Sequence, residues 1–445
     1  MSVRTMIIAA ALLLAPLVAR ANVEITVKSE RTKLPAEGVQ RSNDDKGPPA
    51  KQTIHLTLGK RWVQWDDGSD RGVYDFGRRV SIRVDREAHR LDEVSLFALL
   101  SGRQAELENG LRLGGVLEAA KVGANPMAAT MAEHQFSLRP DTAGTSGIRK
   151  ISGTGEQRYL WQEKELFAYS TELVPLSAAD RDLFIRYVRY EVGGHPEILG
   201  DLQKLNGIPR WLRYSDPVLG DARRLDVVAT KKTPDAPYAL PSLEKATLKN
   251  PEAAAAAATV AASTPALRAA MAERILAGAN KAADAGKPLE AMLGYIERKL
   301  MIDGDMPPDY QKRAEVILKD ENVRALSGSF QVQSEEQARS AVATLMRLAP
   351  LAGEKSYVIG LFRANMEQRL GNRDAAISLF VAALTKNPFI TGAWRDLGDT
   401  LDTGYDAVDT WRCYETARII APAHGMLADI TRGEGILAQE HAEFF

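Results

Sequence analysis

Residues 373–422, RDAAISLFVAALTKNPFITGAWRDLGDTLDTGYDAVDTWRCYETARIIAP, contain a pattern that repeats after 34 residues. In the second half, Trp394 is followed by Leu397, Gly398 and Leu401 at the spacing W-x2-L-G-x2-L. This periodicity predicts helix–turn–helix units, which cannot bury their apolar faces alone and therefore stack on neighbours. The residues that recur 34 positions apart are Phe380 and Tyr414, Ala383 and Ala417, and Pro388 and Pro422.

The stretch over about 357–422 resembles two tetratricopeptide (TPR) repeats. The first helix of the earlier unit departs from the family pattern, because its Trp, Leu and Tyr positions hold Gly360, Arg363 and Glu367. The resemblance implies an α-solenoid whose stacked helix pairs form a concave surface for a protein partner. The residues that it assigns to packing between helices are Ala376, Phe380, Ala383, Pro388, Trp394, Leu397, Gly398, Tyr414, Ala417 and Pro422.

In TPR proteins the first helix of each unit lines the concave groove. In the unit that matches the family pattern better, the positions that correspond to groove-facing residues hold Arg395, Asp399 and Asp402. They are spaced four and three apart and therefore share one helix face. We interpret them as a binding surface for a partner segment of mixed or mildly basic charge; the alternative is that they are ordinary solvated charges.

Helical periodicity extends over the whole region 266–445, in which no segment alternates with period two. The pattern predicts a TPR-like solenoid of four to five helix pairs. A Pro- and Ala-rich stretch at 231–265 precedes it, and we expect a linker there that is part extended and part helical. The expected helices cover roughly 266–281, 288–302, 308–320, 334–348, 355–370, 373–386, 391–403, 407–420 and 425–441.

Residues 22–230 are expected to form a β-rich domain, because several segments alternate apolar and polar residues with period two. The segments 53–58, 60–65, 71–76 and 79–85 predict an antiparallel meander, while residues 30–51 are polar and predict a long irregular stretch. Further strands are expected at 133–138, 148–152, 157–163, 166–174, 210–215 and 224–230, and helices at 95–121, after a cap at Ser177, and at 196–205.

Over roughly 52–215 this domain resembles the secreted half-barrels of lipoprotein-carrier type. The resemblance depends on strand order and on the sequence GVYDF at Gly72–Phe76. It implies a curved antiparallel sheet that wraps apolar contents, with helices that plug the open side.

The N-terminal residues 1–21 have the pattern of a secretory signal peptide. Arg4 precedes the apolar run Met6–Ala19, and Ala19-Arg20-Ala21 fits the small-x-small cleavage pattern. An uncleaved anchor is the alternative, but about 14 apolar residues are fewer than the ~20 that a membrane-spanning helix needs. We therefore expect a periplasmic or secreted protein, cleaved near Ala21, with no membrane span in the mature chain.

Composition argues against several classes of function. Removal of residues 1–21 leaves 55 basic and 58 acidic residues, so no basic excess suggests nucleic acid. The single cysteine, Cys413, cannot form an internal disulfide and is expected to be a small buried residue. The six histidines have no zinc-binding spacing, His195 is expected to cap a turn, and no nucleophile elbow or phosphate-binding loop is present. We expect no metal, cofactor or catalytic residue.

The sequence therefore predicts an α+β protein of two domains: an antiparallel β-rich domain with plugging helices, followed by a TPR-like α-solenoid. The leading hypothesis for its function is a non-enzymatic envelope adaptor that binds a protein partner. The first alternative is a carrier of a lipid or other apolar ligand in the β-rich domain, which a large apolar cavity would favour. The second is a hydrolase of unfamiliar type, which a cleft with a strongly perturbed acid or histidine would favour.

Overall fold

The computed structural model describes residues 21–34, 51–120, 129–139, 146–217, 220–306 and 309–445. The chain divides into two compact units. The N-terminal unit ends at Lys245 and lacks only the segment Val94–Ala105, which belongs with Ala246–Phe445 to the C-terminal unit. Helix α2 (Leu96–Ala119) therefore contributes residues to both units.

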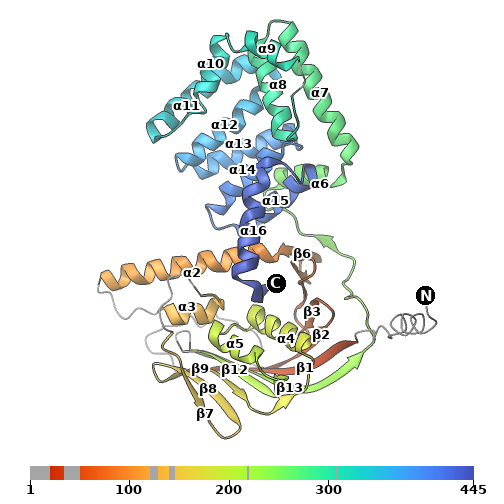
Figure 1. Cartoon of the computed structure of the whole chain (residues 1–445), viewed down its shortest axis with the longest axis vertical. Coiled ribbons are helices and arrows are strands. Elements are labelled where there is room, and N and C mark those ends of the chain that lie inside the picture. Colours follow the sequence, from red (N-terminus) through yellow and green to blue (C-terminus); the bar gives the residue numbers. More distant parts are fainter. Residues whose placement is uncertain (1–20, 35–50, 121–128, 140–145, 218–219, 307–308) are drawn as a thin grey trace, which may run out of the picture. The chain divides into compact units, whose positions relative to one another are not determined.

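A large sheet lies at the centre of the N-terminal unit (Figure 1). Its strand order is β14-β6-β5-β4-β3-β2-β1-β13-β12-β9-β8-β7. β2 to β5 form the expected antiparallel meander, β1 pairs with β2, and β14 adds in parallel to β6. A separate pair joins β10 (Leu173–Val174) to β11 (Ile208–Pro209). The strands of the large sheet are β1 (Asn22–Lys33), β2 (Lys51–Leu58), β3 (Trp62–Asp66), β4 (Arg71–Asp75), β5 (Val80–Asp85), β6 (Arg90–Ser95), β7 (Arg149–Ser152), β8 (Glu156–Trp161), β9 (Lys164–Ser170), β12 (Trp211–Asp216), β13 (Asp221–Thr233) and β14 (Glu244–Lys245).

Alternating apolar residues give the sheet its buried face. Ile25 lies opposite Leu56, and Val27 lies opposite Ile54 across the β1–β2 pair. All four side chains are at most 1% exposed. The period-two pattern therefore predicted both the strands and their buried face correctly.

Two helices, α4 (Ala178–Glu191) and α5 (Pro196–Gln203), lie against one face of this sheet (Figure 1). α4 packs against β2 and β3. The Ser177 hydroxyl caps α4 as predicted, by accepting a hydrogen bond from the backbone N–H of Asp180. Gly193, with φ +95°, follows the end of the helix in a conformation that favours glycine.

Two sequence predictions for this unit were wrong. Residues 133–138 were predicted as a strand, but Ala129–Phe136 form the helix α3, which buries the consecutive residues Thr130–His134. The helix was missed because several of these buried residues are polar, which hides the apolar face from the sequence pattern. Residues 30–33 were predicted to be irregular but continue β1, because they pair with β13.

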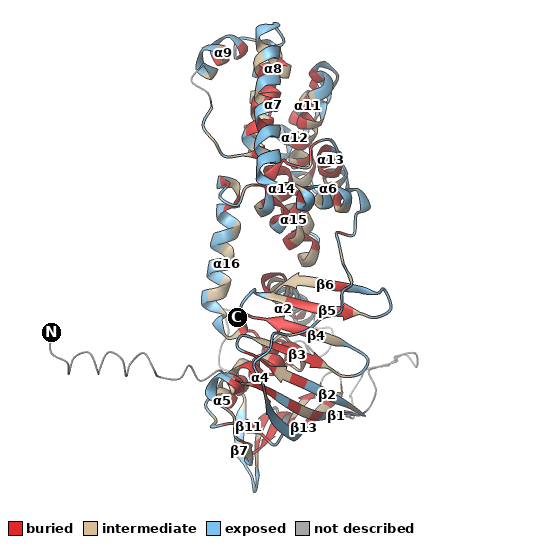
Figure 2. Ribbon diagram, turned by 90° about the vertical axis from the view of Figure 1, so that its right-hand side faces the viewer, coloured by how far each residue is buried: buried red, intermediate tan, exposed pale blue. Residues whose placement is uncertain are grey.

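The C-terminal unit is helical, and buried residues follow the faces on which helices meet (Figure 2). The nine predicted helices are confirmed, and α10 was not predicted. Among the described helices of the chain, none is long and apolar enough to cross a membrane. The α-helices are α6 (Pro251–Ala262), α7 (Pro265–Asp284), α8 (Pro288–Met301), α9 (Tyr310–Ile317), α10 (Glu321–Gly328), α11 (Glu335–Leu348), α12 (Ser356–Arg369), α13 (Arg373–Lys386), α14 (Thr391–Asp402), α15 (Ala407–Ile420) and α16 (Ala428–Glu440).

The predicted linker, 231–265, contains the end of β13, the short strand β14 and the helix α6. Tyr238 belongs to the N-terminal unit, where its hydroxyl donates to Asp75 at 2.9 Å and its ring meets Trp62 edge-on. α6 lies in the other unit and packs against α13 and α15. The boundary between the units lies at Lys245/Ala246, inside the predicted linker.

Candidate functional site

The residues assigned to helix packing lie mostly inside the C-terminal unit. Pro388 is half-buried and Pro422 is exposed, so Pro422 marks the end of α15 rather than a packing position. Cys413 is fully buried, as predicted. The assigned residues that are buried are Ala376, Phe380, Ala383, Trp394, Leu397, Gly398, Tyr414 and Ala417.

Close packing joins α14 to α15. A β-carbon added at Gly398 would lie 2.5 Å from Cε1 of Tyr414, so only a residue without a side chain fits there. Trp394, one turn earlier, is 0% exposed, and its indole N–H donates to the carbonyl of Pro388 at 2.8 Å. The ring of Tyr414 therefore fills a notch in α14, and the indole fixes the start of the same helix.

The predicted partner-binding stripe lies on α14, but its three residues are in different situations. Arg395 forms ion pairs with Asp396 and Asp399, each at 3.0 Å. Asp399 also accepts a hydrogen bond from the hydroxyl of Tyr414 at 2.8 Å. Asp402 is exposed, and no described residue forms a hydrogen bond or an ion pair with its carboxylate.

The acidic groups of this stripe are held in an unfavourable setting. Burial raises the pKa of Asp399, and the nearby charges of Asp396 and Asp402 raise it further, against the lowering effect of Arg395 and Tyr414. Partial loss of hydration also raises the pKa of Asp402. A positive charge brought to this face would stabilise both carboxylates.

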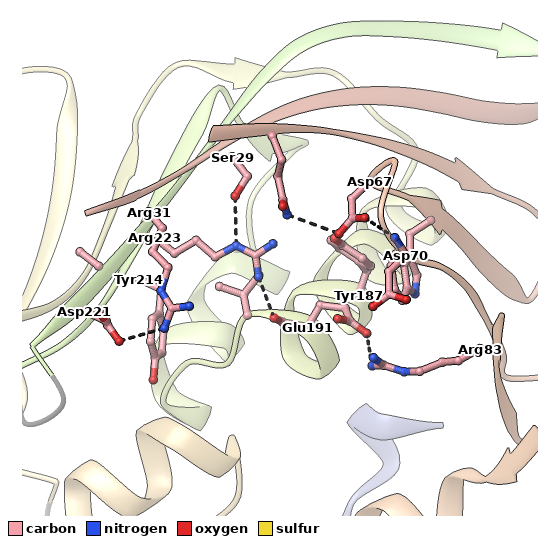
Figure 3. Close-up of a pocket in the computed structure, with 14 residues that line it drawn as sticks. Ser29, Arg31, Asp67, Asp70, Arg83, Tyr187, Glu191, Tyr214, Asp221 and Arg223 are labelled. Carbon is pink, nitrogen blue, oxygen red and sulfur yellow. Dashed lines mark hydrogen bonds and ion pairs between the residues drawn. The ribbon is translucent and has the colours of Figure 1, made fainter. Parts of the chain in front are cut away.

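A second candidate site, not predicted from the sequence, is a cavity of about 300 Å³ in the N-terminal unit. It lies between the sheet and the C-terminal end of α4 (Figure 3). Most of its lining is charged, polar or aromatic. The lining residues come from β1, β2, β3, the turn after β3, β5, α4, β12 and β13; they are Ser29, Arg31, Gln52, Trp65, Asp67, Asp70, Arg83, Tyr187, Glu191, Val192, Tyr214, Asp221, Ala222 and Arg223.

Two of the three arginines in this cavity are neutralised by carboxylates. Arg31 pairs with Asp221 at 2.9 Å, and Arg83 pairs with Glu191 at 2.7 Å. Arg223 instead donates to the hydroxyl of Ser29 and to the backbone carbonyl of Glu191, both at 3.1 Å. In the described part of the chain, no carboxylate forms an ion pair with Arg223.

Two tyrosines line the cavity with hydroxyls that have no hydrogen-bond partner among the described residues. Tyr187 is 2% exposed, and burial raises its pKa, so its phenol stays protonated. Tyr214 stacks flat on His134, with ring centroids 4.4 Å apart. Both phenols are therefore available as neutral donors toward the cavity.

The histidines near the cavity have structural roles. His195 caps α5 by accepting from the N–H of Glu197, as predicted, and its Nε2 lies 2.7 Å from Glu133. Burial lowers the pKa of His134 to about 3, and the neighbouring His195 lowers it further. Both histidines are 0% exposed, so no ligand in the cavity reaches them directly.

Comparisons with known proteins give no further assignment: no family model matches the chain, and no curated protein matches it. Within the described residues, no group of three or more His, Cys, Asp or Glu side chains could hold a metal ion.

Proposed function

We propose that this protein is an exported, non-enzymatic adaptor of the cell envelope, whose C-terminal unit binds a protein partner through a TPR-like array of helices. The observation that carries the proposal is the fit of Tyr414 into the notch at Gly398. Tight packing of paired helices at a 34-residue period is the structural basis of solenoids that bind partners along a groove.

The face of α14 that carries Arg395, Asp399 and Asp402 is the proposed docking surface. Arg395 pairs with both Asp396 and Asp399, and its single positive charge offsets only one of the three negative charges that Asp396, Asp399 and Asp402 place on this helix. The remaining negative charge suits a partner segment with Lys or Arg side chains. The attraction between these opposite charges would raise the association rate and would weaken as the salt concentration rises.

The structure decides which variant tests this surface cleanly. Reversal of the charge at position 399, by Asp399→Lys, would place a second cation beside Arg395 and would remove the acceptor of the hydrogen bond from the Tyr414 hydroxyl. Stability and binding would therefore change together. Asp402 lacks such contacts, and Asp402→Lys therefore changes the charge of the surface with little effect on stability. Glu440→Lys, an exposed acid on α16, is the matched control.

The test is capture of partners from an envelope extract by the two variants at low and moderate salt. We expect Asp402→Lys to reduce capture several-fold at low salt, with a smaller loss as salt rises, and Glu440→Lys to capture like the original chain. Equal capture by both variants at low salt, with unchanged melting temperatures, would assign docking to another surface.

Export is part of the same proposal. The predicted signal peptide falls almost entirely outside the described residues, but the described chain is compatible with cleavage after Ala21. β1 begins at Asn22, which is 4% exposed and donates to the carbonyl of Ala236 at 2.8 Å. Cleavage would leave this strand complete.

A further inference from the structure

We propose that the cavity of the N-terminal unit binds a small zwitterion, such as a free amino acid or a dipeptide, with its carboxylate at Arg223 and its ammonium group at Asp70. This is a second binding activity, independent of partner docking by the C-terminal unit.

The argument for a carboxylate begins with two arginines on neighbouring strands. Arg31 and Arg223 lie directly opposite each other across the β1–β13 pair. Like charges in this position destabilise a sheet. Asp221 balances Arg31, but the hydrogen bonds that Arg223 makes with described residues go to the Ser29 hydroxyl and to a backbone carbonyl, neither of which carries a charge. An anionic group in the cavity would supply the missing counter-charge.

Neutral donors surround the same space. Tyr187 lies next to Glu191 in Figure 3, one helical turn before it on α4. Its hydroxyl forms no hydrogen bond with a described residue, so it can donate to a ligand oxygen in the cavity that Tyr187 lines. A guanidinium together with a phenol is a donor set that recognises carboxylate oxygens.

The other end of the cavity is acidic. Asp67 and Asp70 lie on the turn between β3 and β4. Asp67 holds the turn, since its Oδ1 accepts from the N–H groups of Ser69 and Asp70 at 3.0 and 2.7 Å. The Asp70 carboxylate forms no hydrogen bond or ion pair with a described residue. The guanidinium of Arg83, which interacts with it electrostatically, is shared with Glu191, to which it is directly paired.

The charges therefore select a ligand with two opposite ends. The lining holds three arginines and four carboxylates, and a ligand with a single charge would leave either Arg223 or Asp70 unmatched. A volume of about 300 Å³ is at the small end of the range for ligand sites, which suits an amino acid or a dipeptide better than a lipid.

The test is isothermal titration calorimetry of the full mature chain with the standard free L-amino acids and glycylglycine. Acetate and ethylamine serve as probes that carry only one of the two charges. We expect at least one zwitterion to bind and to bind at least about tenfold more tightly than either single-charge probe.

Three variants assign the binding to the cavity. Arg223→Met removes the guanidinium but keeps most of the stem, Tyr187→Phe removes only the hydroxyl, and Asp70→Asn removes the charge at the acidic end. We expect each to weaken the best zwitterion about tenfold or more. The matched control is Arg224→Met on the same strand, since neighbouring side chains on a strand point to opposite faces and Arg224 pairs with Asp226.

The outcomes separate clearly. Failure of every amino acid and of glycylglycine to bind overturns the proposal, as does equally tight binding of acetate or ethylamine. Binding that survives Tyr187→Phe and Asp70→Asn also overturns it, and these two variants decide the question even if Arg223→Met does not fold. None of these results bears on partner capture by Asp402→Lys, so the two proposals fail separately.

Discussion

Gly398→Ala tests whether α14 and α15 interlock as described. The added methyl group would lie 2.5 and 2.8 Å from Cε1 and Cδ1 of Tyr414 and 3.2 Å from the carbonyl oxygen of Thr410. The ring cannot move freely, because its hydroxyl is bonded to Asp399 and its edge meets Trp411 at a centroid distance of 5.5 Å. The variant must therefore shift α15 relative to α14.

The size of the effect follows from a comparison with Gly360→Ala. Gly360 lies in the interior of α12, and a β-carbon there would meet no atom within 4 Å. Replacement of a helical glycine by alanine gains about 1 kcal/mol at both sites. This gain in helix propensity is the same at both positions, so it cancels when the two variants are compared. The difference in stability that is left is the cost of overpacking at position 398, about 1–3 kcal/mol.

The assay is thermal and denaturant unfolding of the full chain, followed by far-ultraviolet circular dichroism. We expect Gly360→Ala to be as stable as the original chain or more so, and Gly398→Ala to be less stable than Gly360→Ala by about 1–3 kcal/mol, or about 2–4 °C in melting temperature for each kcal/mol. Equal stability of the two variants would refute the packing of Tyr414 against α14.

Three further predictions concern other parts of the chain. Trp394→Ala should cost about 3–5 kcal/mol in the free energy of unfolding, because its side chain is 0% exposed; a loss under about 0.5 kcal/mol in denaturant unfolding would contradict its burial. The pKa of His134 lies at about 3 in the folded chain against 6.5 ordinarily, because of burial. The unfolded chain therefore binds the proton first, and stability should fall between about pH 6.5 and 3 by up to about 1.4 kcal/mol per pH unit. The melting temperature of His134→Gln should depend less on pH across this range than that of the original chain. The same pH dependence in both would count against a lowered pKa of His134. Intact mass of the exported protein should give a chain that begins at Asn22, and a full-length cytoplasmic product would contradict export.

The sequence predicted the regular elements well because their apolar residues are periodic. Ile54, Leu56 and Leu58 alternate on a strand that buries one face, and Ala376, Phe380 and Ala383 recur at helical spacing on α13. The pattern failed where the buried side chains are polar. α3 buries Glu133 and His134, whose hydrogen-bond and ion-pair partners lie far away in the chain.

The cavity could not be predicted, because its residues meet only through tertiary structure. Arg31 and Arg223 are opposite each other because β1 pairs with β13, a strand almost two hundred residues later. One signal was present in the sequence: Ser29 and Arg31 place polar groups on the face of β1 that Ile25 and Val27 make apolar. For the stripe on α14, spacing correctly predicted a shared helix face but not the ion pair of Arg395 with Asp399 or the bond from Tyr414.

Site-specific photo-crosslinking shows whether a partner docks on the face of α14. A photoreactive amino acid replaces Asp402 in one variant and Glu440 in the other, and each is irradiated in the native envelope. Both positions are exposed, so a difference between them reports location rather than accessibility. We expect one dominant crosslinked protein from position 402, which is lost when salt is added before irradiation, and none from position 440. The same products from both positions, or none from position 402, would contradict this expectation.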